Sequence, residues 1–303
     1  MPSSASTAPE PLLAGFSERR VEVSDASLFL RIGGSGPPLL MLHGYPQTHV
    51  IWHRVAPRLA KRFTLVLPDL RGYGQSRGPA PDEAHRHYSK RAMAEDMVRL
   101  MSALGYERFL LAGHDRGARV GYRLALDHPE RVQRFAALEI IPTLDMWERM
   151  DADRALGSYH WMFLAVPPPV PERLIAADPD FYIRHLLKRW AGPGAALDER
   201  AVAAYVEQFR DPAVVAATCA DYRAGASTDR ADDAADRRDG RKIGCPILIV
   251  WGRGYLGTRT SSPAAVWRQW ADDVREVALD CGHFVAEEKP EECAAALVAF
   301  FAV

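Results

Sequence analysis

One aspartate stands where a strand-like segment turns sharply into a helical one. The segment Arg108–Ala112 is apolar and typical of a buried strand, and it runs through GHDRG at 113–117 into a helical pattern. This is the strand–turn–helix context of a nucleophile elbow, with Asp115 in the position that serine more often occupies. The flanking glycines permit a tight turn, and a helix N-terminus favours a carboxylate. Because Asp also caps helices routinely, the interpretation depends on partners elsewhere in the chain.

A second motif, GQSRG at 74–78, matches the residue pattern of a serine elbow but lacks its structural context. No strand leads directly into Ser76, and the following PAP at 79–81 cannot start a regular helix core. We therefore do not expect Ser76 to be a nucleophile.

A base and an orienting acid are found at the ends of other predicted strands. His283 lies in CGHF at 281–284, between the last predicted strand and the last helix. When a nucleophile elbow comes earlier in the chain, a histidine on this late loop is placed to act as the general base. The seventh core strand is followed by WGRGYLG at 251–257, which has no carboxylate, whereas Glu139 ends the sixth. By elimination Glu139 is the acid that orients His283, with Asp145 as the alternative.

An oxyanion hole would complete the site. The segment LHGYP at 42–46 closes the third core strand, where the following loop supplies one backbone donor, and the residue after the nucleophile supplies the other. These positions are the backbone N–H groups of Tyr45 and Arg116.

The elements that must position these residues alternate along the chain. A loose hairpin over Val21–Ile32 is followed by short apolar runs separated by helical stretches such as Ser89–Leu104, which predicts a mostly parallel sheet covered on both faces. Between Pro142 and about Lys242 no strand-like run occurs, and four helix-like pieces predict a helical cap inserted after the sixth strand. We expect a core of residues 1–142 and 243–303 and a cap of 143–242, whose stretch Asp229–Lys242, with five acidic and five basic residues, serves as a solvated connector.

Composition limits the class of protein. The net charge of −1 argues against a nucleic-acid or anionic-membrane binder, and no apolar run could span a bilayer. The first 20 residues form a loose Ser/Pro/Ala-rich start and not a signal peptide. The four cysteines are too scattered for a disulfide scaffold or a zinc site, so we expect reduced thiols in a cytoplasmic protein. No ligand cluster or phosphate-binding loop indicates a metal or other cofactor.

The motifs HGYPQT at 43–48, GHDRGAR at 113–119, the pair His160-Trp161 and CGHF resemble the fluoroacetate dehalogenases of the α/β-hydrolase fold. The resemblance runs from about Gly15 to the C-terminus and implies an eight-stranded, mostly parallel sheet with a helical cap, and a homodimer. It implies Asp115 as nucleophile and His283 as base. Further roles that the resemblance implies are carboxylate binding by Arg116 and Arg119, halide binding by His160, Trp161 and Tyr222, and pocket lining by His114 and Trp190. The orienting acid is usually Asp in that family, whereas Glu139 stands here, as in related haloalkane dehalogenases.

The residue types suit this chemistry. A carboxylate can displace a halide from an sp³ carbon and leave an ester that water can cleave, whereas a serine would leave a stable ether. Arg116 and Arg119 are at i and i+3 on the first helical turn, which suits an anionic substrate. The predicted reaction is hydrolysis of a 2-haloacid, with fluoroacetate giving glycolate and fluoride.

Two alternatives stay open. An epoxide hydrolase uses the same Asp and His with two cap tyrosines, for which the candidates are Tyr159, Tyr182, Tyr205 and Tyr222. The paired arginines argue against it, because a neutral epoxide gives them no partner. A non-catalytic ligand-binding protein is disfavoured by the intact set of Asp115, His283 and Glu139.

Overall fold

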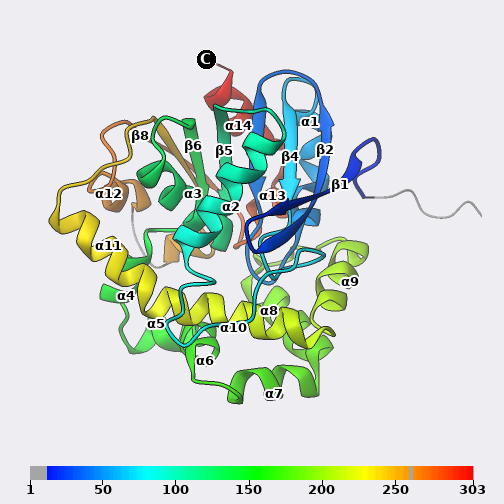
Figure 1. The fold of residues 1–303 in the computed structure, drawn as a ribbon, viewed down its shortest axis with the longest axis vertical. Coiled ribbons are helices and arrows are strands. Elements are labelled where there is room, and N and C mark those ends of the chain that lie inside the picture. Colours follow the sequence, from blue (N-terminus) through cyan, green and yellow to red (C-terminus); the bar gives the residue numbers. More distant parts are fainter. Residues whose placement is uncertain (1–11, 259–261, 303) are drawn as a thin grey trace, which may run out of the picture.

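The computed structural model describes residues 12–258 and 262–302, so most of the segment that we expected to be a loose start lies outside the described residues. Eight strands form one sheet in the order β1-β2-β4-β3-β5-β6-β7-β8 (Figure 1). The strands are β1 (Ser17–Val23), β2 (Ala26–Gly34), β3 (Pro38–Leu42), β4 (Thr64–Pro68), β5 (Phe109–His114), β6 (Val132–Leu138), β7 (Ile247–Gly252) and β8 (Val274–Leu279). Only β2 runs against its neighbours among these strands, so the predicted mostly parallel sheet is confirmed.

Alternating side chains divide the interior into two apolar clusters, one on each face of the sheet. Within β3, Leu39 and Met41 join one cluster, while Leu40 and Leu42 join the other, as the two-residue period of a strand requires. Both faces are therefore buried, which explains why the central strands read as continuous apolar runs.

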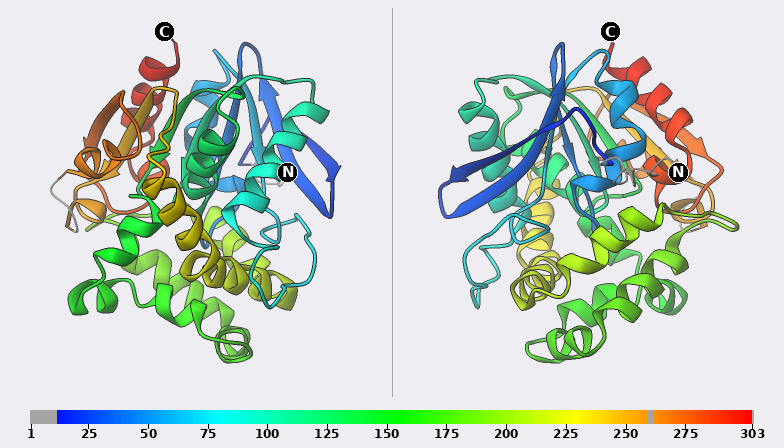
Figure 2. Two further views of the ribbon diagram at one scale, coloured as in Figure 1. Left: turned by 60° about the vertical axis from the view of Figure 1, so that its left-hand side comes forward. Right: turned by 90° about the vertical axis from the view of Figure 1, so that its right-hand side faces the viewer.

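Helices cover both faces of the sheet. Figure 2 shows α2 on one side of the strands, with α1 and α14 on the other. Ser89 caps α2, and Gly105 follows that helix with a φ of +84°, as the sequence indicated. The helices outside the insertion are η1 (His49–Arg54), α1 (Ala56–Leu59), α2 (Lys90–Ala103), α3 (Arg116–Asp127), η2 (Leu256–Thr258), α12 (Pro263–Trp267), α13 (Val285–Glu288) and α14 (Pro290–Phe301).

The interval between β6 and β7 is wholly helical, as predicted, and in Figure 1 the helices α5 to α10 gather below the sheet. It contains eight helices instead of four, because several span only six to eight residues and show little periodicity in sequence. They are α4 (Thr143–Glu148), α5 (Ala152–Gly157), α6 (His160–Ala165), α7 (Val170–Ala177), α8 (Pro179–Trp190), α9 (Glu199–Gln208), α10 (Pro212–Ala226) and α11 (Thr228–Arg238).

The charged stretch that we expected to be a solvated connector is α11, and that expectation is wrong. Its residues Asp229, Asp233 and Asp236 are all at most 3% exposed. Asp236 pairs with Arg123 of α3, and Asp233 accepts a hydrogen bond from Tyr122 at 2.8 Å. Acids at this spacing lie on one helical face, and buried side chains of the core donate hydrogen bonds to the carboxylates on that face.

All four cysteines are free thiols, and three of them are buried. No helix within the described residues is long and apolar enough to cross a bilayer.

Candidate active site

Asp115 occupies a strained turn between β5 and α3, so the predicted strand–turn–helix arrangement is present. Its φ of +46° and ψ of −115° are unusual for a residue with a side chain and cost of order 1–3 kcal/mol. Gly117 makes the close approach possible, because a Cβ there would lie 2.4 Å from the backbone oxygen of His43. Asp115 is 8% exposed and lines a cavity at this turn.

The backbone N–H of Tyr45 points at the Asp115 carboxylate and donates to Oδ1 at 3.0 Å. On the other side of the same peptide unit, the Gly44 carbonyl accepts from Nδ1 of His43 at 3.0 Å. Because C=O and N–H of a trans peptide point in opposite directions, this bond aims the Tyr45 N–H at Asp115. Burial lowers the pKa of His43 to about 4, and Leu70 N–H donates to Nε2, so the neutral ring carries its proton on Nδ1. The N–H of Arg116 lies at the start of α3, and its oxyanion role stays a prediction.

Glu139 directly follows β6 beside this turn, with a φ of +64° and 3% exposure. Its Oε1 accepts from the N–H groups of Gly252 at 2.9 Å and Leu256 at 3.2 Å, which hold the carboxylate at the carboxyl edge of the sheet. Glu139 lines the same cavity as Asp115 and His283.

His283 is 3% exposed, and both its backbone N–H and its backbone carbonyl are hydrogen-bonded. Its N–H donates to the Trp190 carbonyl at 2.8 Å, and Nε2 of His114 donates to its carbonyl at 2.8 Å. His114 itself is fully buried and is not among the residues that line the cavity, so its expected pocket-lining role is corrected to support of the His283 backbone.

A tight cavity joins these side chains between the sheet and the inserted helices. The cavity has a volume of about 20 Å³, so only a ligand of a few atoms fits without side-chain movement. Its walls are Asp115, Arg119, Glu139, Ile140, Ile141, Met146, His160, Trp161, Trp190, Tyr255, Leu256 and His283.

The two arginines of α3 lie in different surroundings, although their spacing predicted a common task. Arg116 donates from Nε and Nη2 to the Asp221 carboxylate at 3.0 and 2.5 Å, and it does not line the cavity. Arg119 does line it, and Nη1 donates to the Ile141 carbonyl at 3.1 Å and to Thr143 Oγ1 at 3.0 Å. Within the described residues, no carboxylate oxygen forms an ion pair with Arg119. Burial, and then repulsion from Arg116, lowers the pKa of Arg119, so an anion beside it would stabilise its charge.

Three of the predicted pocket residues from the inserted helices are at the cavity, and a fourth lies behind them. His160, Trp161 and Trp190 line the cavity, and the rings of His160 and Trp190 are 4.4 Å apart. Tyr222 of α10 packs edge-on against Trp161 at 5.9 Å and does not itself line the cavity. Burial, and next the charge of Asp115, raises the pKa of Tyr222 well above its ordinary value, which indicates that the phenol lies near the carboxylate.

The residues that competed for catalytic roles are engaged elsewhere. The Ser76 hydroxyl donates to the Asp69 carbonyl at 2.7 Å and accepts from a β2 amide at 2.9 Å, which is a structural role. Asp145 accepts from Trp270 Nε1 at 2.8 Å and pairs with Arg237 at 2.6 Å, outside the cavity.

Sequence reasoning missed Asp221, which is fully buried on α10. Besides Arg116, it accepts from the Lys90 ammonium and from the Tyr73 hydroxyl at 2.7 Å. Burial alone would raise the pKa of Asp221, but Arg116 and Lys90 hold it far below its usual range. A charged residue directly after the apolar run PAVVAATCA at 212–220 was the available signal.

The fold, the Asp115 turn and the cavity between the sheet and the inserted helices define a class of enzyme. The sequence profile of the α/β-hydrolase fold matches residues 37–290, and the chain belongs to this family.

Within that family, the chain is related to fluoroacetate dehalogenase and to epoxide hydrolases. It is 43% identical over 290 residues to fluoroacetate dehalogenase of a Burkholderia sp., covering 95% of each chain. It is 34% identical over 273 residues to soluble epoxide hydrolase of a Corynebacterium sp., covering 89% of this chain and 91% of that one. A solved structure from Nostoc sp PCC 7120, described as a candidate α/β hydrolase, superposes with a TM-score of 0.92 at 48% identity, covering 95% of this chain and 98% of that one. A mutant of a candidate epoxide hydrolase from Pseudomonas aeruginosa, with bound MFA, gives 0.90 at 46% identity, covering 97% and 98%.

Proposed function

We propose that this α/β hydrolase cleaves the carbon–halogen bond of small 2-haloacids and converts fluoroacetate to glycolate and fluoride. The observation that carries the proposal is Arg119, a buried cation without a carboxylate partner among the described residues, in the same cavity as Asp115. A substrate carboxylate would supply the missing anion and would orient the adjacent halogen-bearing carbon. The 43% identical relative that is named fluoroacetate dehalogenase supports the same substrate class.

In the first step, one oxygen of Asp115 attacks the carbon that bears the halogen, and the halide leaves with the bonding electron pair. The N–H of Tyr45 already binds Oδ1. Oδ2 is therefore the attacking atom, and Oδ1 becomes the carbonyl oxygen of the resulting ester. The departing halide would be hydrogen-bonded by His160, Trp161 and Tyr222.

In the second step, His283 accepts a proton from a water molecule as that water attacks the ester carbonyl. The negative charge develops on Oδ1, which already faces the Tyr45 N–H, and Glu139 stabilises the charged imidazole. Collapse of the intermediate returns Asp115 as a carboxylate and releases glycolate. One water molecule is consumed, and one proton is released with the halide.

Epoxide hydrolysis is less well supported, because it needs two tyrosine hydroxyls over the nucleophile. Tyr222 is near Asp115 but does not line the cavity, and none of the other three candidates lines it. Tyr205 instead donates its hydroxyl to Glu287 at 3.1 Å. The other two are Tyr159 and Tyr182.

The proposal is tested by measuring fluoride from fluoroacetate and chloride from chloroacetate, beside diol formation from styrene oxide. We expect halide release that Asp115→Asn abolishes, and little diol. Diol formation without halide release from any haloacetate would contradict the proposal and favour the epoxide alternative.

A further inference from the structure

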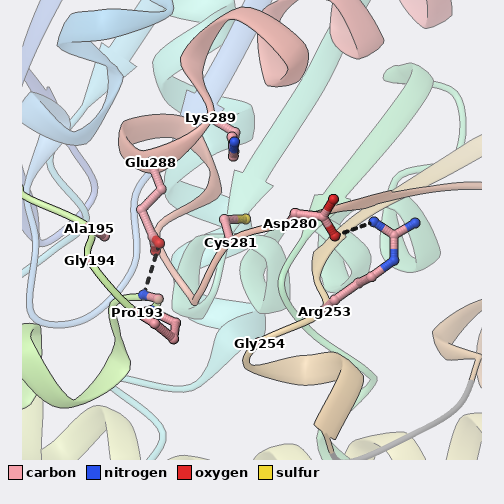
Figure 3. A pocket seen from close by; sticks show the side chains of 10 residues that line it. Pro193, Gly194, Ala195, Arg253, Gly254, Asp280, Cys281, Glu288 and Lys289 are labelled. Atoms are coloured by element: carbon pink, nitrogen blue, oxygen red, sulfur yellow. Dashed lines mark hydrogen bonds and ion pairs between the residues drawn. The ribbon is translucent and has the colours of Figure 1, made fainter.

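An open groove of about 490 Å³ lies on the far side of the His283 loop, between the inserted segment that follows α8 and the loops after β7 and β8. Figure 3 shows Glu288 reaching across it toward the backbone beside Pro193, while Arg253 pairs with Asp280 at 2.8 Å. The described residues of the groove thus include the Glu288 carboxylate, which connects the segment at Gly192 with the loop at Gly282.

The Glu288 carboxylate accepts three backbone hydrogen bonds. Oε2 accepts from the N–H of Gly192 at 2.9 Å and from that of Gly282 at 2.8 Å, and Oε1 accepts from Phe284 at 2.9 Å. Hydrogen bonds to an ionised acceptor are about twice as strong as neutral ones. One half-buried side chain therefore holds the residues on both sides of His283 and also one residue of the insertion.

The remaining amide of the loop is also bound to the insertion, since the His283 N–H donates to the Trp190 carbonyl. The two backbones touch here: a Cβ on Gly282 would lie 2.2 Å from Gly192 N and 2.5 Å from Trp190 O. Trp190 is also a wall of the cavity. Movement of the insertion at Trp190–Gly192 would therefore displace the His283 backbone and the cavity wall together.

We propose that Glu288 is a positioning residue. Its three backbone hydrogen bonds, which we call the clamp, fix the His283 loop and bind it to the inserted segment Trp190–Gly192. Glu288 lies outside the cavity and touches no reacting atom. Its kinetic consequence rests on the proposed function: because His283 acts only in ester hydrolysis, loosening its loop slows that step more than it slows alkylation of Asp115.

The test compares Glu288→Gln with Glu291→Gln, a control three residues further along, in the first turn of α14, whose side chain is 74% exposed. Glutamine retains one acceptor oxygen but turns an NH₂ donor toward a backbone N–H, so at least one bond of the clamp is lost. By hydrogen exchange with mass spectrometry, we expect exchange of peptides covering 190–192 and 282–284 to rise at least about tenfold in Glu288→Gln only. Unchanged exchange in both segments would overturn the proposal.

The kinetic arm uses rapid quenching and mass measurement of the fluoroacetate-treated enzyme. We expect ester hydrolysis to slow about 10- to 100-fold in Glu288→Gln, so that the Asp115 ester accumulates and KM falls together with kcat. Equal slowing of both steps would show a general loss of structure and would overturn the positioning role.

A second variant breaks the clamp from the other side. In Gly192→Ala the new Cβ would lie 2.7 Å from Gly282 N, so exchange at 282–284 should rise although the change is in the insertion. If the wild-type enzyme releases no halide, the proposed function fails, whereas the exchange measurements still decide whether the clamp exists.

Discussion

Replacing Asp221 by asparagine removes the carboxylate that is shared by two buried cations, Arg116 and Lys90. Asp221 and Arg116 are fully buried, and Lys90 is 1% exposed. The nearest other carboxylate to Lys90 belongs to Asp229, at 3.7 Å. Asparagine keeps the size of the side chain but leaves Arg116 and Lys90 facing each other without their shared counter-ion.

Breaking a buried ion pair by removing one partner costs about 3–5 kcal/mol. Burial and the Arg116 charge already lower the pKa of Lys90, so Lys90 can relieve part of the cost by losing its proton. We therefore expect Asp221→Asn to lower the free energy of unfolding by about 3 kcal/mol. That is a large fraction of the roughly 5–15 kcal/mol of a typical domain.

The assay is urea unfolding followed by tryptophan fluorescence, with Asp180→Asn as the matched control. Asp180 pairs with Arg184 on the surface, and such pairs contribute about 0–1 kcal/mol. A loss below about 1 kcal/mol in Asp221→Asn, equal to that of the control, would refute the reasoning that Asp221 is the buried counter-ion of this network.

Three further predictions concern the cavity and the surrounding helices. Arg119→Gln should lower kcat/KM for fluoroacetate about 10- to 100-fold in steady-state kinetics, because a charge-assisted contact to the substrate is lost; unchanged kcat/KM would place the carboxylate elsewhere. Tyr222→Phe should slow fluoride release about tenfold while affecting chloride release less, since fluoride depends more on hydrogen-bond donors; equal effects would contradict a halide role. Burial raises the pKa of Glu287 to about 8, above its unfolded value, so its contribution to stability is present at low pH and is lost as pH rises toward 8. Glu287→Gln should therefore gain stability relative to wild type as urea unfolding is moved from pH 5 to pH 8, and a constant difference would refute this.

The positions of Asp115, Glu139 and His283 could be predicted because each is set by a strand end. Carboxyl ends of parallel strands meet at one edge of the sheet, so local sequence was enough to bring the three side chains together. The turn at Asp115 also depends on neighbours within two residues, which the sequence displays directly.

The separate surroundings of Arg116 and Arg119 could not be predicted from helical spacing. Spacing gives the helical face of a residue, but the partner of Arg116 is Asp221, more than one hundred positions away on an inserted helix. For the same reason α11 was misread, since a run of mixed charges is the same sequence signal whether its acids are solvated or bound by buried side chains such as Arg123, Tyr122 and Lys90. The structural role of Glu288 could not be predicted either, because this residue belongs to the acidic run EEKPEE at 287–292, which is typical of a surface.

The origin of the oxygen atom in glycolate tests the nucleophilic role of Asp115 most directly. The measurement is a single turnover of fluoroacetate by excess enzyme in ¹⁸O-water, followed by mass analysis of the product and of the Asp115 peptide. Because water attacks the ester carbonyl, we predict one ¹⁸O atom in the Asp115 carboxylate and unlabelled oxygen transferred to glycolate. Labelled glycolate together with an unlabelled Asp115 peptide would mean direct attack by water and would contradict the account.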